Sequence, residues 1–164
     1  MGWSVVHAGV SDVENIGSKN SEGSKIYLNA QTWAVLGDVA DAEKLPKILK
    51  AVDSMEHDFG FPLNLPPYQK YSPNVGRMSG MLPGLFENGG VYCHATGFKI
   101  LMDCKVGRGS KAFETLKKLC RTVIKIHPCN PEQNHMFLQT VILPIPDIME
   151  NPTSPGQREL LRGA

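Results

Sequence analysis

Residues 82–95 read Leu82-Pro-Gly-Leu-Phe-Glu-Asn-Gly-Gly-Val-Tyr-Cys-His-Ala95, and this stretch organises the chain around it. Its proline and three glycines predict a turn-rich loop, which carries the carboxylate of Glu87 beside the carboxamide of Asn88. His94 follows at the start of a predicted helix, where free N–H groups and the positive end of the helix dipole favour an anion. The stretch therefore predicts a site for a polyol and an anion, although an ordinary turn and a structural histidine have the same residues.

Length and composition indicate one ordinary globular domain. The chain has 164 residues, of which 41% are hydrophobic and 20% charged. Its formal net charge of +1 gives no strong attraction to nucleic acid or to an anionic membrane. No apolar run approaches the ~20 residues of a membrane span, and no secretory signal is visible. We therefore expect a cytoplasmic protein that binds neither nucleic acid nor a membrane.

The four cysteines are Cys93, Cys104, Cys120 and Cys129. They show neither a CxxC pair nor the spacing of a zinc site, so the sequence predicts reduced thiols and no metal. Packing is the preferred interpretation of Cys93.

Apolar spacing predicts four helices in two pairs, over residues 27–40, 41–59, 90–105 and 110–123. Asp41 is a candidate N-cap of the second helix, and Pro46 lies within its first turns. Residues 61–90 form a long loop rich in proline and glycine, and such loops tend to be functional. No segment alternates as a strand does, so the expected fold class is all-α. The predicted helical core includes Leu28, Trp33, Val35, Val39, Ile48, Val52, Met55, Phe98, Leu101, Phe113 and Leu116.

Two parts of the chain differ in pattern. Residues 1–126 read as part of a helical domain, whereas residues 127–164 are proline-rich and have neither caps nor periodicity. A folded domain rarely ends in such a long irregular tail.

Taken together, the motifs resemble the catalytic domain of the family 94 glycoside phosphorylases, which include cellobiose, cellodextrin and chitobiose phosphorylases. The resemblance covers roughly residues 12–125 in one order. Its pieces are Ile16-Gly-Ser18, Glu22-Gly23, Ile26 to Val35, Pro67-Tyr68, Gly76-Arg77, Pro83-Gly84, Glu87 to His94, Gly107-Arg-Gly109 and Ala112-Phe-Glu114.

The resemblance implies a partial (α/α)6 barrel, with helix pairs joined by long active-site loops. It also implies an inverting enzyme that cleaves a β-linked, cellobiose-like disaccharide or oligosaccharide with inorganic phosphate in the place of water, giving a sugar 1-phosphate. Phosphate is the co-substrate, no other cofactor is expected, and full-length members are expected to be homodimers.

The same resemblance assigns the candidate site residues. His94 matches a phosphate-contacting histidine, and Glu87 matches a carboxylate beside the transferred sugar. Asn88, Arg77 and Gln31 are the further candidates for substrate binding. For Gln31, the role of a buried or helix-capping amide remains an open alternative. For Arg77, the alternative is an ordinary loop arginine in contact with solvent.

No catalytic residue is expected within this chain, because the general-acid aspartate of the family lies upstream of the matched motifs. Phe86 is a departure, since several members carry lysine there, and this leaves the acceptor sugar undefined.

The tail admits an explanation in a different reading frame. If each codon begins one base earlier from Gln133, residues 134–144 permit Glu-Pro-Tyr-Val-x-x-Asn-Cys-Tyr-Phe-Ala, which the family would have next. In the shifted frame, the codons of Met136-Phe137 can give only valine at the fourth position of this segment. The codons of Met149-Glu150 can give only glycine, which also matches the family. We expect a frame change between about Leu119 and Gln133.

Two rival functions remain open on the sequence. One is a non-catalytic or degenerate helical module, and the other is a helical-barrel hydrolase that uses water.

Overall fold

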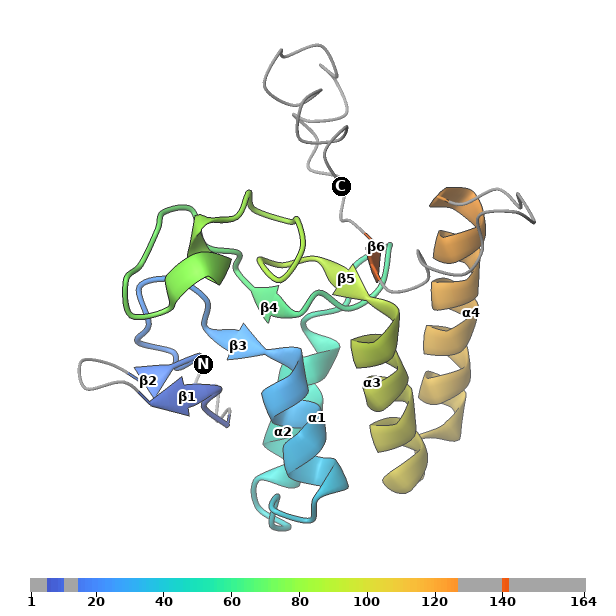
Figure 1. Cartoon of the computed structure of the whole chain (residues 1–164). Helices are drawn as coiled ribbons and strands as arrows, with labels where there is room; N and C mark the ends of the chain where they lie inside the picture. The colour runs from blue at the N-terminus through green and yellow to red at the C-terminus, as the bar shows by residue number, and fades with distance from the viewer. Residues whose placement is uncertain (1–5, 11–14, 127–139, 142–164) are drawn as a thin grey trace.

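The computed structural model describes residues 6–10, 15–126 and 140–141 (Figure 1). Within these residues lie α1 (Leu28–Leu36), α2 (Leu45–Asp53), α3 (Cys93–Lys105), α4 (Gly109–Ile126) and the 3-10 helix η1 (Gly76–Gly80). The four predicted helices are therefore confirmed. None of the helices in the described part of the chain is long and apolar enough to cross a membrane.

Six two-residue strands accompany the helices and form three antiparallel pairs. They pair as β1 (Gly9–Val10) with β2 (Asn15–Ile16), β3 (Ile26–Tyr27) with β4 (Asn64–Leu65), and β5 (Val91–Tyr92) with β6 (Thr140–Val141). The fold is thus helical with a little sheet rather than purely helical. Strands of two residues are too short to produce the alternation by which a sequence reveals them. Apart from β6, the predicted tail lies outside the described residues.

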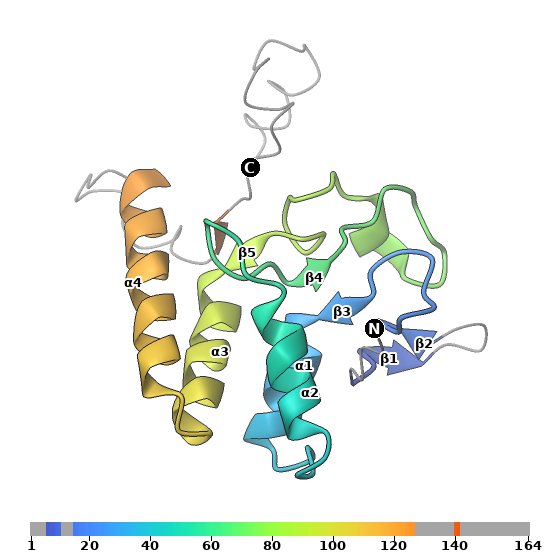
Figure 2. The same ribbon diagram turned by 180° about the vertical axis from the view of Figure 1, so that it is seen from behind.

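The helices form a row with one helix behind it. α3 packs between α1 and α4, and α2 packs against α1 (Figures 1 and 2). β3 runs directly into α1 and β5 runs directly into α3, so both helices begin at the end of the molecule where the loops gather. This arrangement places two helix N-termini beside the long loop.

Local residues explain where the helix boundaries depart from prediction. α1 ends at Leu36 because the chain turns through Asp38, which has a left-handed φ of 57°. α2 begins at Leu45 rather than after Asp41, and Pro46 lies in its first turn, where no hydrogen-bond donor is needed. The Asp41 side chain instead accepts a hydrogen bond from Lys44 N at 2.7 Å and caps the turn before the helix.

The core lies between α1, α2 and α3 beneath the short strands. Its buried members are Ile26, Leu28, Ala34, Val35, Ile48, Ala51, Val52, Met55, Phe61, Ala95 and Met102. The predictions for Leu28, Val35, Ile48, Val52 and Met55 are confirmed.

For five other residues the predicted burial in the core is wrong. Trp33 is 52% exposed and Leu101 is 56% exposed, and Val39, Phe113 and Leu116 are exposed as well. The buried face of α3 instead carries the polar residues Thr96, Lys99 and Asp103 beside Ala95 and Met102. A sequence pattern shows that a stripe is apolar but does not show whether a partner is present to cover it.

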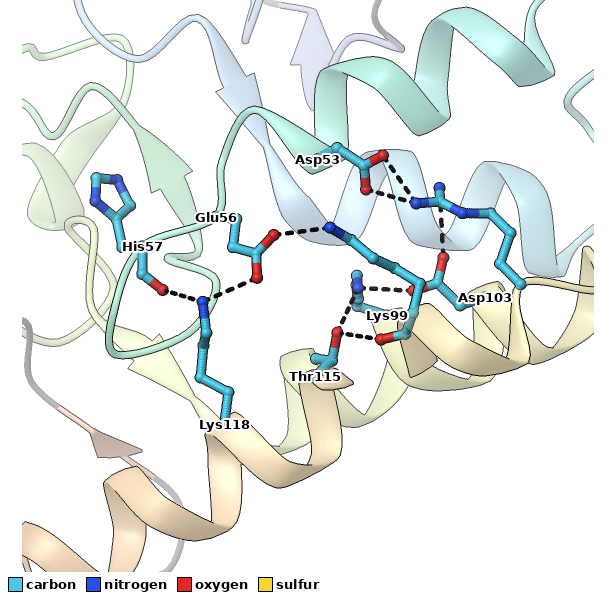
Figure 3. Close-up of polar contacts among 9 residues, drawn as sticks. Asp53, Glu56, His57, Lys99, Asp103, Thr115 and Lys118 are labelled. Carbon is cyan, nitrogen blue, oxygen red and sulfur yellow. Dashed lines mark hydrogen bonds and ion pairs between the residues drawn. The ribbon is translucent and has the colours of Figure 1, made fainter. Parts of the chain in front are cut away.

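A polar network joins α2, α3 and α4 on the buried face of α3 (Figure 3). The Lys99 ammonium is fully buried, lies 2.7 Å from Asp103 Oδ2, donates to Thr115 Oγ1 at 2.6 Å and sits 4.3 Å above the centre of the Phe61 ring. Burial lowers the pKa of Lys99, and the hydrogen bond and charge of Asp103 oppose that effect. Arg108 donates to both carboxylate oxygens of Asp53 at 2.8 Å and so fixes the α3–α4 turn to the end of α2.

Glu56 makes a second link between the end of α2 and α4. Its carboxylate accepts hydrogen bonds from Lys111 at 2.9 Å and Lys118 at 2.8 Å (Figure 3). Burial is the largest single influence on Glu56 and favours its neutral form. The hydrogen bonds and charges of the two lysines together outweigh burial and lower the pKa from 4.5 to about 2.

We predict that the exposed apolar side chains make the isolated chain self-associate or remain molten, because uncovered apolar patches favour association. Leu101→Gln combined with Leu116→Gln should shift the chain towards monomer in sedimentation velocity runs. Val39→Gln is the matched control, since Val39 is also exposed but lies in the turn after α1, and it should change nothing. A natural-sequence monomer with a sharp, reversible thermal transition would contradict the prediction.

We predict that Glu56→Gln lowers the free energy of unfolding by about 1–2 kcal/mol at pH 7, allowing for solvent screening. Because the folded-state pKa of Glu56 is lowered, its contribution is present above the unfolded pKa of 4.5 and is lost as the pH falls towards about 2. Urea unfolding at pH 7 and pH 2.5, in the Leu101→Gln/Leu116→Gln background, should show a difference between Glu56→Gln and the parent that is much smaller in acid. The control is Glu43→Gln, which removes an exposed ion pair with Lys47 and should have no measurable effect.

Candidate functional site

The loop that carries Glu87 is a tight turn. Asn88 N donates to Leu85 O at 3.0 Å and Gly84 N donates to Asn88 O at 2.7 Å, which leaves Phe86 and Glu87 exposed at the tip. Phe86 has a φ of 46°, a left-handed conformation that is uncommon for a bulky residue. The turn therefore presents the Glu87 carboxylate to solvent.

Gly90 follows this turn and packs against its backbone. Its N–H donates to Phe86 O at 3.0 Å, and a Cβ at this position would lie 2.3 Å from the same oxygen. Only glycine fits so close an approach, which explains the second glycine of the Glu-Asn-Gly-Gly motif.

Asn88 is fully buried and holds the turn to two other segments. Its Oδ1 accepts from Tyr68 N at 2.7 Å, while its Nδ2 donates to Tyr68 O at 2.9 Å and to Met81 O at 2.8 Å. Met81 follows η1, so this amide also fixes the position of the segment that carries Arg77. Both Nδ2 hydrogens are thus already used inside the protein.

Asn64 is a second buried amide beneath the turn, and sequence reasoning missed it. Its Oδ1 accepts from Gly89 N at 2.7 Å, and its Nδ2 donates to Ser24 Oγ, which in turn donates to Pro66 O at 2.5 Å. A single amide between two leucines, Leu63 and Leu65, is the signal that could have revealed it. Asn64 and Asn88 together fix the backbone on both sides of the loop.

Three motif pieces meet around the side chain of Tyr68. The hydroxyl groups of Tyr27 and Tyr68 are hydrogen-bonded at 2.7 Å. Gly23 lies against the Tyr68 ring, and a Cβ there would come within 2.0 Å of it. The Glu22-Gly23 and Pro67-Tyr68 pieces are therefore parts of one packed support.

His94 is the second residue of α3 and is exposed. Its ring contacts those of Tyr92 and Phe98, with centroid separations of 5.3 Å and 6.0 Å. Tyr92 is the N-cap residue but its side chain does not cap the helix, and the first turn has no acidic residue. The first N–H groups of α3 therefore have no side-chain cap and can meet an anion.

Gln31 and Arg77 have different environments. Gln31 is fully buried, and its amide accepts from Val6 N at 3.0 Å and donates to Val6 O at 2.7 Å. This matches the buried-amide alternative left open by the sequence. Arg77 is exposed on η1 and forms no ion pair within residues 15–126.

The described thiols form no disulfide and belong to no cluster of possible metal ligands in this part of the chain. Cys93, Cys104 and Cys120 are free, and burial raises the pKa of the Cys93 thiol. Cys129 lies outside the described residues. Where side chains are described, no three His, Cys, Asp or Glu residues gather as a metal site requires.

The structure thus separates the predicted site residues into two groups. Glu87, Arg77 and His94 are exposed around the loop, and the chain passes from the Glu87 turn through β5 straight into the helix that carries His94. Asn88 and Gln31 are buried and bound to backbone groups. A carboxylate, a guanidinium and an imidazole with unused hydrogen-bonding capacity suit a ligand that has both hydroxyl groups and a negative charge.

Comparison with known proteins identifies three relatives that are named as phosphorylases. The chain is 45% identical over 108 residues to the solabiose phosphorylase of Paenibacillus borealis. It is 42% identical over 131 residues to the 3-O-beta-D-glucopyranosyl-beta-D-glucuronide phosphorylase of the same organism, and 33% identical over 115 residues to the cellobionic acid phosphorylase of Neurospora crassa.

The matches cover most of this chain but little of the relatives. They include 65%, 79% and 68% of this chain, but only 14%, 16% and 14% of the length of the three relatives. The family model for the glycosyl hydrolase 94 superfamily catalytic domain matches residues 2–134. With its motifs, its relatives and this match in agreement, the chain belongs to the glycosyl hydrolase 94 superfamily and lies within its catalytic domain.

Proposed function

We propose that the chain is part of an inverting glycoside phosphorylase, which cleaves a β-linked disaccharide with inorganic phosphate to give a sugar 1-phosphate and a free sugar. The observation that carries this proposal is the 42–45% identity to two disaccharide phosphorylases. On this proposal, α1 to α4 are inner and outer helices of a partial (α/α)6 barrel, and the complete enzyme is a homodimer.

The exposed residues take the contacts with substrates. His94 donates an N–H to a phosphate oxygen at the uncapped start of α3, where the helix dipole adds to the attraction. Glu87 binds hydroxyl groups of the transferred sugar and stabilises the positive charge that develops in the transition state. Arg77 adds a cation beside the same loop.

The buried candidates support the site more than they contact substrate. Asn88 has both Nδ2 hydrogens engaged and Gln31 is paired with Val6, so each has little capacity left for a sugar. We assign both to the walls of the substrate site, where they hold the turn and the start of α1 in place.

The mechanism needs one proton donor for the leaving oxygen but no general base, because phosphate is already a nucleophile. On this proposal the acid is an aspartate of the complete enzyme outside this chain. We therefore predict that the 164-residue chain alone gives no measurable phosphorolysis of a disaccharide. Sugar 1-phosphate produced by the purified chain would contradict this.

A chimaera tests the activity directly. Residues 15–126 of this chain should replace the matching segment of the Paenibacillus borealis solabiose phosphorylase. We expect disaccharide cleavage that requires phosphate and yields a sugar 1-phosphate with inverted configuration, followed by NMR. Cleavage without phosphate would support the rival hydrolase, and a folded but inactive chimaera would support the non-catalytic module.

Within the chimaera, we predict that His94→Ala raises the KM for phosphate by about 10- to 100-fold, the cost of one charge-assisted hydrogen bond. Glu87→Gln should instead lower kcat by about 100-fold even at saturating phosphate, because it removes charge stabilisation. Steady-state kinetics with each substrate varied separately distinguish the two. An unchanged phosphate KM in the His94 variant would return that residue to a purely structural role.

We also predict that Asn88→Ala and Glu87→Gln differ in stability. Asn88→Ala leaves the backbone groups of Tyr68 and Met81 without partners and should cost about 2–4 kcal/mol of unfolding free energy. Glu87→Gln, one residue away but exposed, should leave the unfolding midpoint in urea unchanged. Equal midpoints for the two variants would contradict the assignment of Asn88 to the support.

We further propose that residues from about 119–133 onward are read in a shifted frame relative to the family. The permitted Glu-Pro-Tyr-Val segment and the two forced residues support this. The coding DNA decides it: if the frame that begins one base earlier lacks those codons, the idea is refuted.

A further inference from the structure

A series of aromatic rings runs from α3 to α1 through the candidate phosphate ligand. The His94 ring meets Tyr92 at 5.3 Å with an interplanar angle of 75°, and meets Phe98 at 6.0 Å with an angle of 78°. Phe98 in turn meets Trp33 at 4.9 Å with an angle of 56°. All three separations lie in the ~4.5–7 Å range of favourable aromatic pairs.

Helical spacing explains why the rings meet. His94 and Phe98 are four residues apart on α3, so their side chains lie on one face of the helix. Tyr92 directly precedes the helix, and Trp33 comes from the neighbouring α1. The imidazole is therefore contacted by two rings, one from the residue before the helix and one from a residue one turn into it.

These contacts are not those of a buried core. Trp33 is 52% exposed, His94 is exposed, and Phe98 and Tyr92 are half-buried. Trp33 and Phe98 are also absent from the buried residues that join α1, α2 and α3. A residue that is half exposed to solvent contributes less to packing than a core residue. The contact of Trp33 with Phe98 therefore calls for a second explanation.

We propose that Phe98, backed by Trp33, is a positioning residue that fixes the His94 imidazole for phosphate. This inference rests on the proposed function and adds a residue to it. A histidine that is free to rotate loses that freedom when it binds, which weakens affinity by about two- to tenfold. The flanking rings remove most of that loss beforehand, because they restrict the ring of His94 in the absence of phosphate.

The test uses the full chain in the Leu101→Gln/Leu116→Gln background, which keeps all four rings. Proton NMR of the histidine rings gives the His94 signals, assigned by comparison with a His94→Gln sample. Ring relaxation and cross-peaks to Phe98 report how firmly the imidazole is held. Titration with inorganic phosphate reports binding independently of ring order.

Four variants separate positioning from packing. Phe98→Leu removes the ring but keeps an apolar side chain, and Phe98→Tyr restores a ring. Trp33→Leu removes the backing residue at a half-exposed position, where the fold tolerates the change. Phe113→Leu is the matched control, since Phe113 is an exposed aromatic residue on α4 outside the series.

We expect Phe98→Leu to increase the mobility of the His94 ring and to weaken phosphate binding by about two- to tenfold. Trp33→Leu should have a smaller effect in the same direction, and Phe98→Tyr and Phe113→Leu should match the parent. If the His94 ring is equally ordered in Phe98→Leu and in the parent, the positioning role is refuted. A parent whose His94 signal does not respond to phosphate refutes the phosphate role of the proposed function, while ring relaxation still decides whether Phe98 holds the imidazole.

Discussion

The buried ion pair between Lys99 and Asp103 is the interaction on which the helical part of the structure depends. Two charges removed from water cost several kcal/mol unless their remaining hydrogen-bonding capacity is met. α3 cannot meet that demand alone. Thr115 of α4 accepts a hydrogen bond from Lys99, and Arg108 lies 3.5 Å from Asp103 Oδ1 as an ion pair, although this oxygen accepts no hydrogen bond within the described residues. Because Arg108 also holds Asp53, one pair fixes the positions of α2 and α4 relative to α3. Its effect is to specify one arrangement, even where an apolar substitute of equal volume would be as stable.

In the loop that carries Glu87, the buried polar groups are neutral amides, and they too require hydrogen-bond partners. Asn64 and Asn88 are fully buried. Asn88 exchanges hydrogen bonds with backbone groups of distant segments, whereas Asn64 accepts from Gly89 N and donates to the Ser24 hydroxyl. An unsatisfied amide in such a place would cost about 1–3 kcal/mol, so the loop has one favourable conformation despite its glycines and prolines. The molecule therefore combines a rigid support with exposed side chains at the tip, as binding loops commonly do.

Sequence reasoning succeeded where periodicity and turn chemistry act locally. It located all four helices, and it located the loop because proline and glycine mark turns directly. It failed where the outcome depends on what lies opposite. Trp33 and Leu101 belong to apolar stripes, but burial requires a covering element that no stripe can specify. Lys99 and Asp103 were missed because opposite charges four residues apart normally indicate a solvated helix face. Asn88 was predicted to contact substrate, and its environment shows how the same motif residue can instead hold the loop.

The Gly90 contact has an evolutionary consequence. A methyl group at Gly90 would meet the Phe86 carbonyl oxygen, but that oxygen belongs to the backbone and is present whatever side chain residue 86 carries. The backbone shape of the turn therefore does not depend on the side chain that residue 86 carries at its tip. The side chain of Phe86 can therefore change while Gly90, Asn88 and Asn64 preserve the shape of the turn. A loop built in this way lets a lineage explore new ligands without refolding, and selection on ligand preference and selection on stability then act on different residues.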